Sequence, residues 1–444
     1  MVTAKGEDMK KQRITAELWD KMQYLFRNYY DRMVHAVLYY DKPLDIRILK
    51  SVLVATTEKV PVLHSSFHDS VINPYWEIEE YSINDILTVK DTDSEHLEAD
   101  IEEFITQCIP VESNVQFKVA VFNEGGRSVF AMIVNHMCFD GGDFKYFLKR
   151  LSANYSAAVK GDAAVEIKTG TRSYDQVYTK LEGEDKETAK KLYKNISQVK
   201  DEHYFPLTPS SPEDKSMINR CKMDAETFSL FRAIGKHYGV TINDLMLTVY
   251  MHSLYEFGQY PATDTLTIPC MVDLRRHIEG GEEAGGLTNH TGFMQCSVDG
   301  VGATLNDTLI KVLRSVRKSK HDKFMGLYSL PLLKLAYTIF PYAISETAIK
   351  IGYLNPLIGM SNIGLLRPDQ LTMGDATPVD GFMTGAVKYK PYMQLALTTM
   401  NNEITMTIAI RGNGEDKLLV EKFFSILMRN VRQFIADNIK YLKA

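Results

Sequence analysis

The pattern of apolar positions is clearest at Val129–Val134, where six consecutive residues are apolar and rich in β-branched and aromatic types. A run of this kind is typical of a strand that is buried on both faces. Gly141 and Gly142 follow and predict a turn. Apolar residues then recur at helical spacing over Phe144–Tyr155, and Asp143 is expected as the N-cap of this helix. A strand, a turn and a helix are therefore predicted in succession.

The same reading predicts alternating strands and helices along the whole chain. In the first part we expect strands over 32–41 and 115–122, a helix that begins after Asp45, an extended segment ending at Phe67, a helix over 94–105, and a hairpin turn at 124–127. In the second part we expect helices that begin after Asp224 and at Thr241, strands over 265–272, 291–298, 357–364, 380–388, 392–399 and 403–410, and helices over 305–325, 330–352 and 417–441.

A segment without strong periodicity separates the two parts. Residues 160–216 contain charge clusters and three prolines, which is typical of a linker, and they include one expected helix over 184–199. At 444 residues the chain exceeds one typical core. We therefore predict an N-terminal lobe over 1–165, a linker over 166–214 and a C-terminal lobe over 215–444.

Composition narrows the class of protein. The 51 Lys and Arg residues against 56 Asp and Glu residues give a net charge of −5, which lacks the basic excess of a nucleic-acid binder. Five widely spaced cysteines without a C-x-x-C pair, and an N-terminus without an apolar segment, favour a reducing cytoplasmic location. The apolar stretch Leu330–Ile344 is too short to span a bilayer and is interrupted by proline and lysine.

His136 and Asp140 lie between the buried strand and the helix, and strand ends are where α/β proteins place their chemistry. Histidine can remove a proton from an alcohol, amine or thiol near neutral pH. The carboxylate of Asp140 would orient the imidazole directly or hold the loop through an arginine elsewhere. The alternative is a structural histidine with satisfied hydrogen bonds at a strand end, and spacing alone does not separate the two.

Other kinds of site have weaker support in the sequence. A metal site lacks a third nearby ligand, and no nucleotide-binding glycine motif is present. Around Ser361 the second glycine comes one residue too late for the nucleophile elbow of a hydrolase. Cys138 has apolar neighbours and is expected to be a buried, inert thiol.

Residues 135–141, Asn-His-Met-Cys-Phe-Asp-Gly, resemble the His-His-x-x-x-Asp-Gly signature of the condensation-domain and chloramphenicol-acetyltransferase-like superfamily. Five further segments resemble segments of the family and occur in the family's order: 60–67, 241–247, 269–275, 286–289 and 361–364. The resemblance covers nearly the whole chain. It implies an α/β (α+β) fold of two similar lobes, each a mixed β-sheet with flanking helices, around a central tunnel.

The resemblance also implies roles for individual residues. His136 would be the general base, and Asp140 would point away from the substrate and pair with Arg275. The expected substrate-binding residues are Asn135, Gly141, Asn289, Ser361 and Asn362. Within this set, Gly141 would allow close approach of the backbone, and Ser361 or Asn362 would donate a hydrogen bond to the oxyanion.

The implied activity is acyl transfer from a coenzyme A or phosphopantetheine thioester, as co-substrate, to a small-molecule hydroxyl or amine acceptor. No permanently bound cofactor and no metal are expected. Asn135 stands where the double-histidine form has its first histidine, and no Asp-Phe-Gly-Trp-Gly segment of the plant branch is present. We expect a stand-alone member, with a separate acyl or peptidyl carrier protein as an alternative partner. Condensation of carrier-bound substrates and non-catalytic acyl binding stay open as alternatives.

Overall fold

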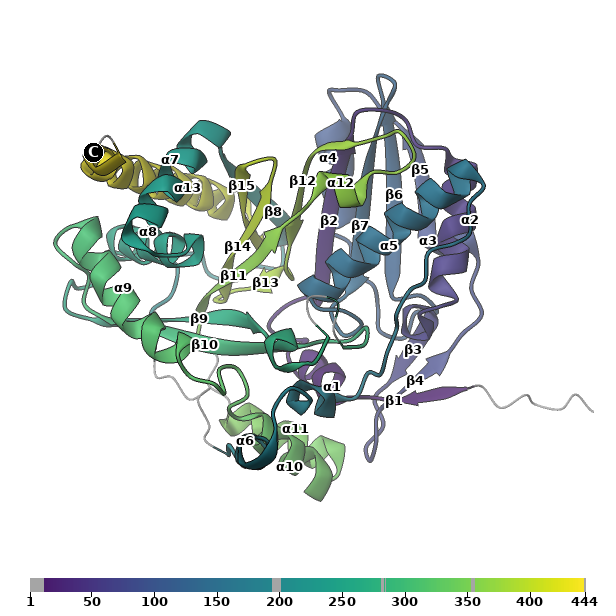
Figure 1. Cartoon of the computed structure of the whole chain (residues 1–444), viewed down its shortest axis with the longest axis horizontal. Coiled ribbons are helices and arrows are strands. Elements are labelled where there is room, and N and C mark those ends of the chain that lie inside the picture. The colour runs from purple at the N-terminus through teal and green to yellow at the C-terminus, as the bar shows by residue number, and fades with distance from the viewer. Residues whose placement is uncertain (1–11, 194–200, 281–282, 284, 353–355, 443–444) are drawn as a thin grey trace, which may run out of the picture.

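In the computed structural model, the apolar run found in the sequence is the centre of a five-stranded mixed sheet (Figure 1). Its strands, in spatial order, are β12 (Pro378–Thr384), β2 (Met33–Tyr40), β7 (Arg127–Asn135), β6 (Phe117–Glu124) and β5 (Leu87–Asp91). The structure describes residues 12–193, 201–280, 283, 285–352 and 356–442.

Strand β7 is buried on both faces, as predicted, because helices cover each side of the sheet. Phe130, Met132 and Val134 pack in the core that contains α2 (Ile46–Thr57) and α5 (Gly141–Lys160). The alternate residues of β7, among them Ala131 and Ile133, pack on the opposite face with α4 (Leu97–Ile105). Alternating side chains of one strand therefore fill two separate cores.

The second large sheet has seven strands and one thick helical layer. Its strands are β10 (Thr291–Asp299), β9 (Thr265–Asp273), β11 (Ile358–Leu365), β14 (Met393–Met400), β15 (Glu403–Gly412) and β13 (Lys388–Tyr389), with β8 (Lys215–Met223) also paired to β15. The helices that share its main core are α7 (Ala225–Tyr238), α8 (Ile242–Gly258), α9 (Leu305–Lys320) and α13 (Gly414–Asn438). Figure 1 shows this half of the molecule beside the first sheet.

A strand from the second half of the chain completes the first sheet. Strand β12 pairs antiparallel with β2, and the yellow-green β12 lies beside the purple β2 in Figure 1. The two parts of the chain are thereby joined by backbone hydrogen bonds. The predicted boundaries at 165 and 214 stay predictions. Of the helix predicted over 184–199, α6 (Gly183–Ala189) is present, and 194–200 lie outside the described residues.

The remaining elements lie around these two sheets. A small three-stranded sheet consists of β1 (Arg13–Thr15), β4 (Tyr75–Ile78) and β3 (Ser65–His68). The remaining short helices are α1 (Leu18–Leu25), α3 (Ile83–Ile86), α10 (Leu330–Ile339), α11 (Tyr342–Gly352) and α12 (Pro368–Leu371). The helix predicted over 330–352 is thus two helices, because Pro341 cannot continue the first one. No helix in the described part of the chain is long and apolar enough to cross a membrane.

The predicted N-cap of the helix after β7 was wrong, and this junction carries His136 and Asp140. Helix α5 begins at Gly141, and its N-cap is Asp140 rather than Asp143, because the Asp140 side chain accepts a hydrogen bond from the Asp143 backbone. Gly141 and Gly142 therefore form the first turn of the helix instead of a separate turn. Asp140 consequently has a helix-capping role in addition to any role in the site.

Candidate active site

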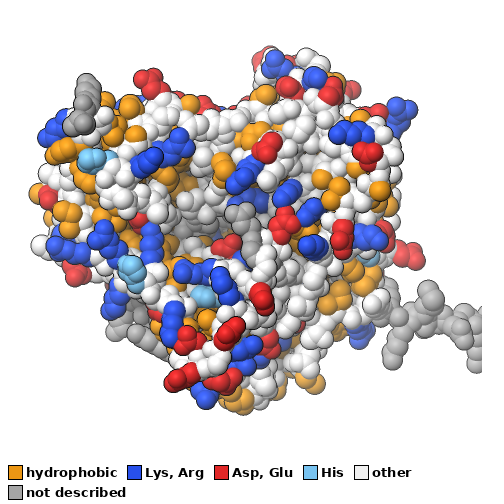
Figure 2. Space-filling model, in the orientation of Figure 1, with side chains coloured by type: hydrophobic (Ala, Val, Ile, Leu, Met, Phe, Trp, Pro, Cys, Tyr) orange, Lys and Arg blue, Asp and Glu red, His pale blue; other side chains and the backbone are white. Residues whose placement is uncertain are grey.

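A cavity of about 490 Å³ lies between the two large sheets, and residues of both sheets line it. On the face shown in Figure 2 the surface is hollowed between the two halves of the molecule, and Lys and Arg side chains border the hollow. Six of the eight predicted site residues line the cavity: His136, Asp140, Gly141, Arg275, Ser361 and Asn362. The fold thus brings together residues that are more than 200 positions apart in the sequence.

The backbone of His136 is held from two sides at the end of β7. Its N–H donates to the carbonyl of Arg32 at 2.7 Å, and its own carbonyl accepts a hydrogen bond from Asn289 Nδ2 at 2.7 Å. The imidazole is half-buried, and its Nδ1 is buried without a hydrogen-bond partner among the described residues. This arrangement leaves Nε2 as the ring nitrogen open to the cavity.

The surroundings of His136 favour its neutral form. Burial lowers the pKa of His136 below its ordinary value, and the nearby Lys388 ammonium acts in the same direction. Backbone carbonyls and the charge of Asp140 oppose this lowering without cancelling it. A neutral imidazole is the form that can accept a proton.

Asp140 does not contact the imidazole, because its oxygens are occupied elsewhere. Arg275 donates to both carboxylate oxygens at 3.1 Å, and the Asp143 and His290 backbones donate to them at 2.8 and 2.6 Å. Burial alone would raise the pKa of Asp140, but Arg275, His290 and these hydrogen bonds outweigh it and lower the pKa. The expected contact between Asp140 and Arg275 is therefore present, and Asp140 holds the loop rather than orienting the ring.

Arg275 is the centre of a larger charged group that the sequence did not reveal. Its guanidinium also contacts Asp143 at 2.7 Å and Asp273 at 3.1 Å. A Cβ added to Gly142 would lie 2.6 Å from Nη1 of Arg275, whereas at Gly141 the nearest atom would be 3.5 Å away. Within the protein, a side chain at position 142 would therefore collide with Arg275, and one at position 141 would fit. The close approach expected of the Gly141 backbone stays a prediction.

Asn135 and Asn289 do not line the cavity. The Asn135 amide is buried, donates to Gln116 Oε1 at 2.8 Å and accepts from the Met137 backbone at 3.0 Å. Asn289 is buried behind His136 and binds its carbonyl. Both side chains hold the backbone around His136, and their expected contact with substrate stays a prediction.

The sequence over residues 22–329 matches the family model described as the condensation domain. The chain belongs to the condensation-domain family. This confirms the resemblance seen in the sequence, and it supports acyl transfer or condensation as the general kind of chemistry. No protein with a curated description matches the chain.

Solved structures place this condensation-domain protein in the same fold. The first condensation domain of the CDA synthetase has a TM-score of 0.68 at 15% identity, covering 95% of this chain and 96% of that one. Trichothecene 15-O-acetyltransferase TRI3 from Fusarium sporotrichioides has a TM-score of 0.69 at 10% identity, covering 97% and 96%. An epimerization domain of tyrocidine synthetase B has a TM-score of 0.66 at 13% identity, covering 98% and 99%. Identities this low show the shared fold alone.

Arg172 holds the loop after His136 in this condensation-domain protein, and the sequence reading missed it. Its guanidinium donates to the carbonyls of Met137 and Cys138 at 3.1 Å each, and it forms an ion pair with Asp20. The segment that carries Arg172 lacks periodicity, and the sequence therefore predicts a linker there. No signal in a single sequence connects such an arginine to backbone carbonyls 34 positions away.

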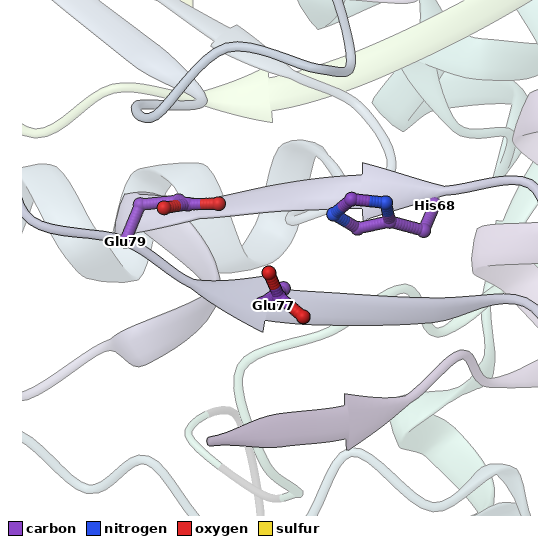
Figure 3. Close-up of side chains that lie close together, drawn as sticks. All are labelled: His68, Glu77 and Glu79. Atoms are coloured by element: carbon purple, nitrogen blue, oxygen red, sulfur yellow. The ribbon is translucent and has the colours of Figure 1, made fainter. Parts of the chain in front are cut away.

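Within the described ranges of the chain, two groupings of His, Asp and Glu side chains are close enough to suggest metal ligands, and both lie near an arginine. In the first, Asp140, Asp143 and His290 lie around Arg275. In the second, His68 is on β3, Glu77 is on β4 and Glu79 directly follows β4 (Figure 3), and Glu77 pairs with Arg13 at 2.9 Å. Arg275 already neutralises the carboxylates of the first grouping, and Arg13 pairs with Glu77 of the second. Neither grouping is assigned as a metal site.

Proposed function

We propose that the chain is an acyltransferase that moves an acyl group from a coenzyme A or phosphopantetheine thioester to a hydroxyl or amine acceptor. The observation that supports this best is the histidine at the end of β7, which lines the cavity between the two large sheets while its backbone is held from both sides. A positioned base with a neutral ring matches the requirement of acyl transfer to a weakly acidic acceptor.

In this mechanism His136 acts through Nε2. It removes the proton of the acceptor hydroxyl or amine as the acceptor attacks the thioester carbonyl carbon. The tetrahedral intermediate then collapses, the carbon–sulfur bond breaks, and the imidazolium returns its proton to the departing thiolate. The products are an ester or amide and a free thiol.

Strand β11 offers donors for the oxyanion of the intermediate. Ser361 and Asn362 both line the cavity, and Asn362 Oδ1 accepts a hydrogen bond from the Gly364 backbone at 3.0 Å. This bond orients the amide and leaves Nδ2 available as a donor. One well-placed donor of this kind is worth about 3 kcal/mol of barrier lowering.

The test is acyl transfer by the purified chain with a panel of acyl-CoA donors and alcohol or amine acceptors, read by mass spectrometry. His136→Ala is expected to lower turnover by roughly 10²–10⁴-fold without loss of the fold. The matched control is His321→Ala, because His321 is an exposed residue at the end of α9. Wild-type turnover by His136→Ala would refute the role as base.

A second candidate, condensation of carrier-bound substrates, is supported by the family match over residues 22–329. The same panel separates the two candidates when each acyl group is offered both on coenzyme A and on a phosphopantetheinylated carrier protein. Turnover only with the carrier-bound form would favour condensation. A chain that binds acyl thioesters and transfers them to no acceptor would favour the non-catalytic alternative.

A further inference from the structure

The lysine at position 388 has a location that neither the motif nor the proposed mechanism explains. It lies on the two-residue strand β13, which pairs with β15, and its side chain lines the cavity that contains His136. Its backbone neighbours are bonded to the segment before β2, with Tyr389 N donating to Tyr29 O at 2.9 Å. The Nζ atom lies 3.9 Å from the ring centroid of Tyr30. Both halves of the molecule thus fix this side chain at the cavity.

The Lys388 ammonium has no direct counter-ion in the described part of the chain. Among the residues that the structure describes, none forms a hydrogen bond or ion pair with it, and Asp31 is the carboxylate that influences it. Asp31 Oδ1 already accepts hydrogen bonds from the backbones of Met33 and Val387, each at 3.0 Å. Burial raises the pKa of Asp31 to about 7, so this carboxyl is only partly charged at neutral pH.

Lys388 nevertheless remains mostly protonated at neutral pH. Burial lowers its pKa to about 8, and the charge of Asp31 limits the lowering. A partly desolvated ammonium without a partner is costly, and the cost is recovered when an anion binds beside it. The ring of Tyr30 compensates only a small part of this charge.

The other charged side chains that line the cavity are already paired. Arg275 is bound by Asp140 and Asp273, which are the two acidic residues of the lining. Lys145 donates to the Ile363 carbonyl at 2.7 Å. Lys388 is therefore the cation of the lining that is available to a ligand. The lining also has an apolar part, which includes Trp19, Met22, Phe26, Leu333, Ala336 and Ile349.

We propose that Lys388 binds an anionic group, a carboxylate or a phosphate, on an otherwise apolar substrate that occupies the cavity. The inference rests on the proposed function only in that it treats this ligand as a substrate for acyl transfer. The acceptor or acyl group is then an amphiphilic acid, with its anion at Lys388 and its apolar body against α1 and α10.

Binding of simple probes to the full chain tests the proposal without any thioester. Octanoate, octyl phosphate and octan-1-ol share one apolar body and differ in the head group. Titration is followed by the fluorescence of Trp19, which lines the cavity, and by calorimetry. Wild type is expected to bind at least one of the two anions about 10–100-fold more tightly than octanol, the usual worth of a charged hydrogen bond. The stronger of the two anions identifies carboxylate or phosphate as the group.

Variants test whether the preference for the anion depends on the Lys388 side chain itself. Lys388→Met and Lys388→Gln should both lose the preference for the anion, and Lys388→Arg should keep most of it. Lys145→Met removes another cation of the lining and should keep the preference for the anion over octanol. His136→Ala should also keep the preference, so failure of the proposed catalysis and failure of this inference are distinguishable.

Three results would overturn the proposal. The first is equal affinity of wild type for the anions and octanol, or no binding of either anion. The second is an anion preference that persists in both Lys388→Met and Lys388→Gln. The third is a loss of turnover in Lys388→Met that is equal for charged and uncharged acceptors and also equal for charged and uncharged acyl groups, which would make the lysine a general electrostatic catalyst instead.

Discussion

Two cationic side chains border the same cavity and are compensated in opposite ways. The Arg275 guanidinium is buried and contacts the carboxylates of Asp140, Asp143 and Asp273. The Lys388 ammonium is half-buried and contacts an aromatic ring but no carboxylate of the residues that the structure describes. A charge that carboxylates of its own protein already neutralise is suited to holding a loop, because it gains little from binding a further anion. A charge left unpaired beside a cavity is suited to a ligand.

Removing the Arg275 guanidinium should have the largest effect on stability. Arg275→Ala leaves the buried carboxylates of Asp140 and Asp143 without their shared partner, which should cost about 3–5 kcal/mol in the free energy of unfolding. Urea denaturation followed by circular dichroism measures this loss. A cost below about 1 kcal/mol would show that the Arg275 group does not hold the loop.

The two halves of the ion pair should not act independently. Asp140→Asn should destabilise the protein and remove activity, and adding Arg275→Ala should cost less than the sum of the two single changes. Contacting partners of this kind typically show coupling energies of about 0.5–3 kcal/mol. Denaturation of the four members of the double-mutant cycle gives the coupling, and strict additivity would contradict the pairing.

Removing the Lys388 ammonium should stabilise the protein, whereas removing the Arg275 guanidinium should destabilise it. Because the folded-state pKa of Lys388 is lowered to about 8 from 10.5, charging it opposes folding below pH 8, and this penalty fades as pH rises from 8 to 10.5. Lys388→Met should therefore stabilise the protein by roughly 1–2 kcal/mol at pH 7 and by much less near pH 10. Thermal melts across this range test it, and a destabilised variant at pH 7 would mean that the ammonium has a partner in solution.

The smallest effect expected is on the pH dependence of activity. The pKa of His136 is lowered by burial and by Lys388, so the acid limb of kcat/KM should lie below the ordinary histidine value of about 6.5. Removing the ammonium in Lys388→Met should move this limb to higher pH, because the imidazolium then meets less repulsion. Lys145→Met serves as the control, and an unmoved limb in Lys388→Met would show that the two side chains are not electrostatically coupled.

Much of the local structure could be predicted because its causes are local. The apolar run of β7, the Asp45 cap of α2 and the Thr241 capping box of α8 depend on residues within a few positions of each other. The N-cap of α5 was predicted at Asp143 and is Asp140, because residue type alone does not separate two good capping residues three positions apart. Asp140 and Asp143 are both good caps by type, and the choice depends on which side chain accepts the hydrogen bond.

The sequence by itself determined the strand that carries His136, the helix that follows it, and the family, since these depend on periodicity and on a short motif. The tertiary structure alone decided which charges meet. Arg172 reaches the loop from a segment without a pattern, Lys388 enters the cavity from a two-residue strand, and β12 completes a sheet begun more than 300 residues earlier. Contacts at such separations depend on how sheets pack and on which hydrogen-bonding edges stay open, and no local pattern of residue types encodes that choice.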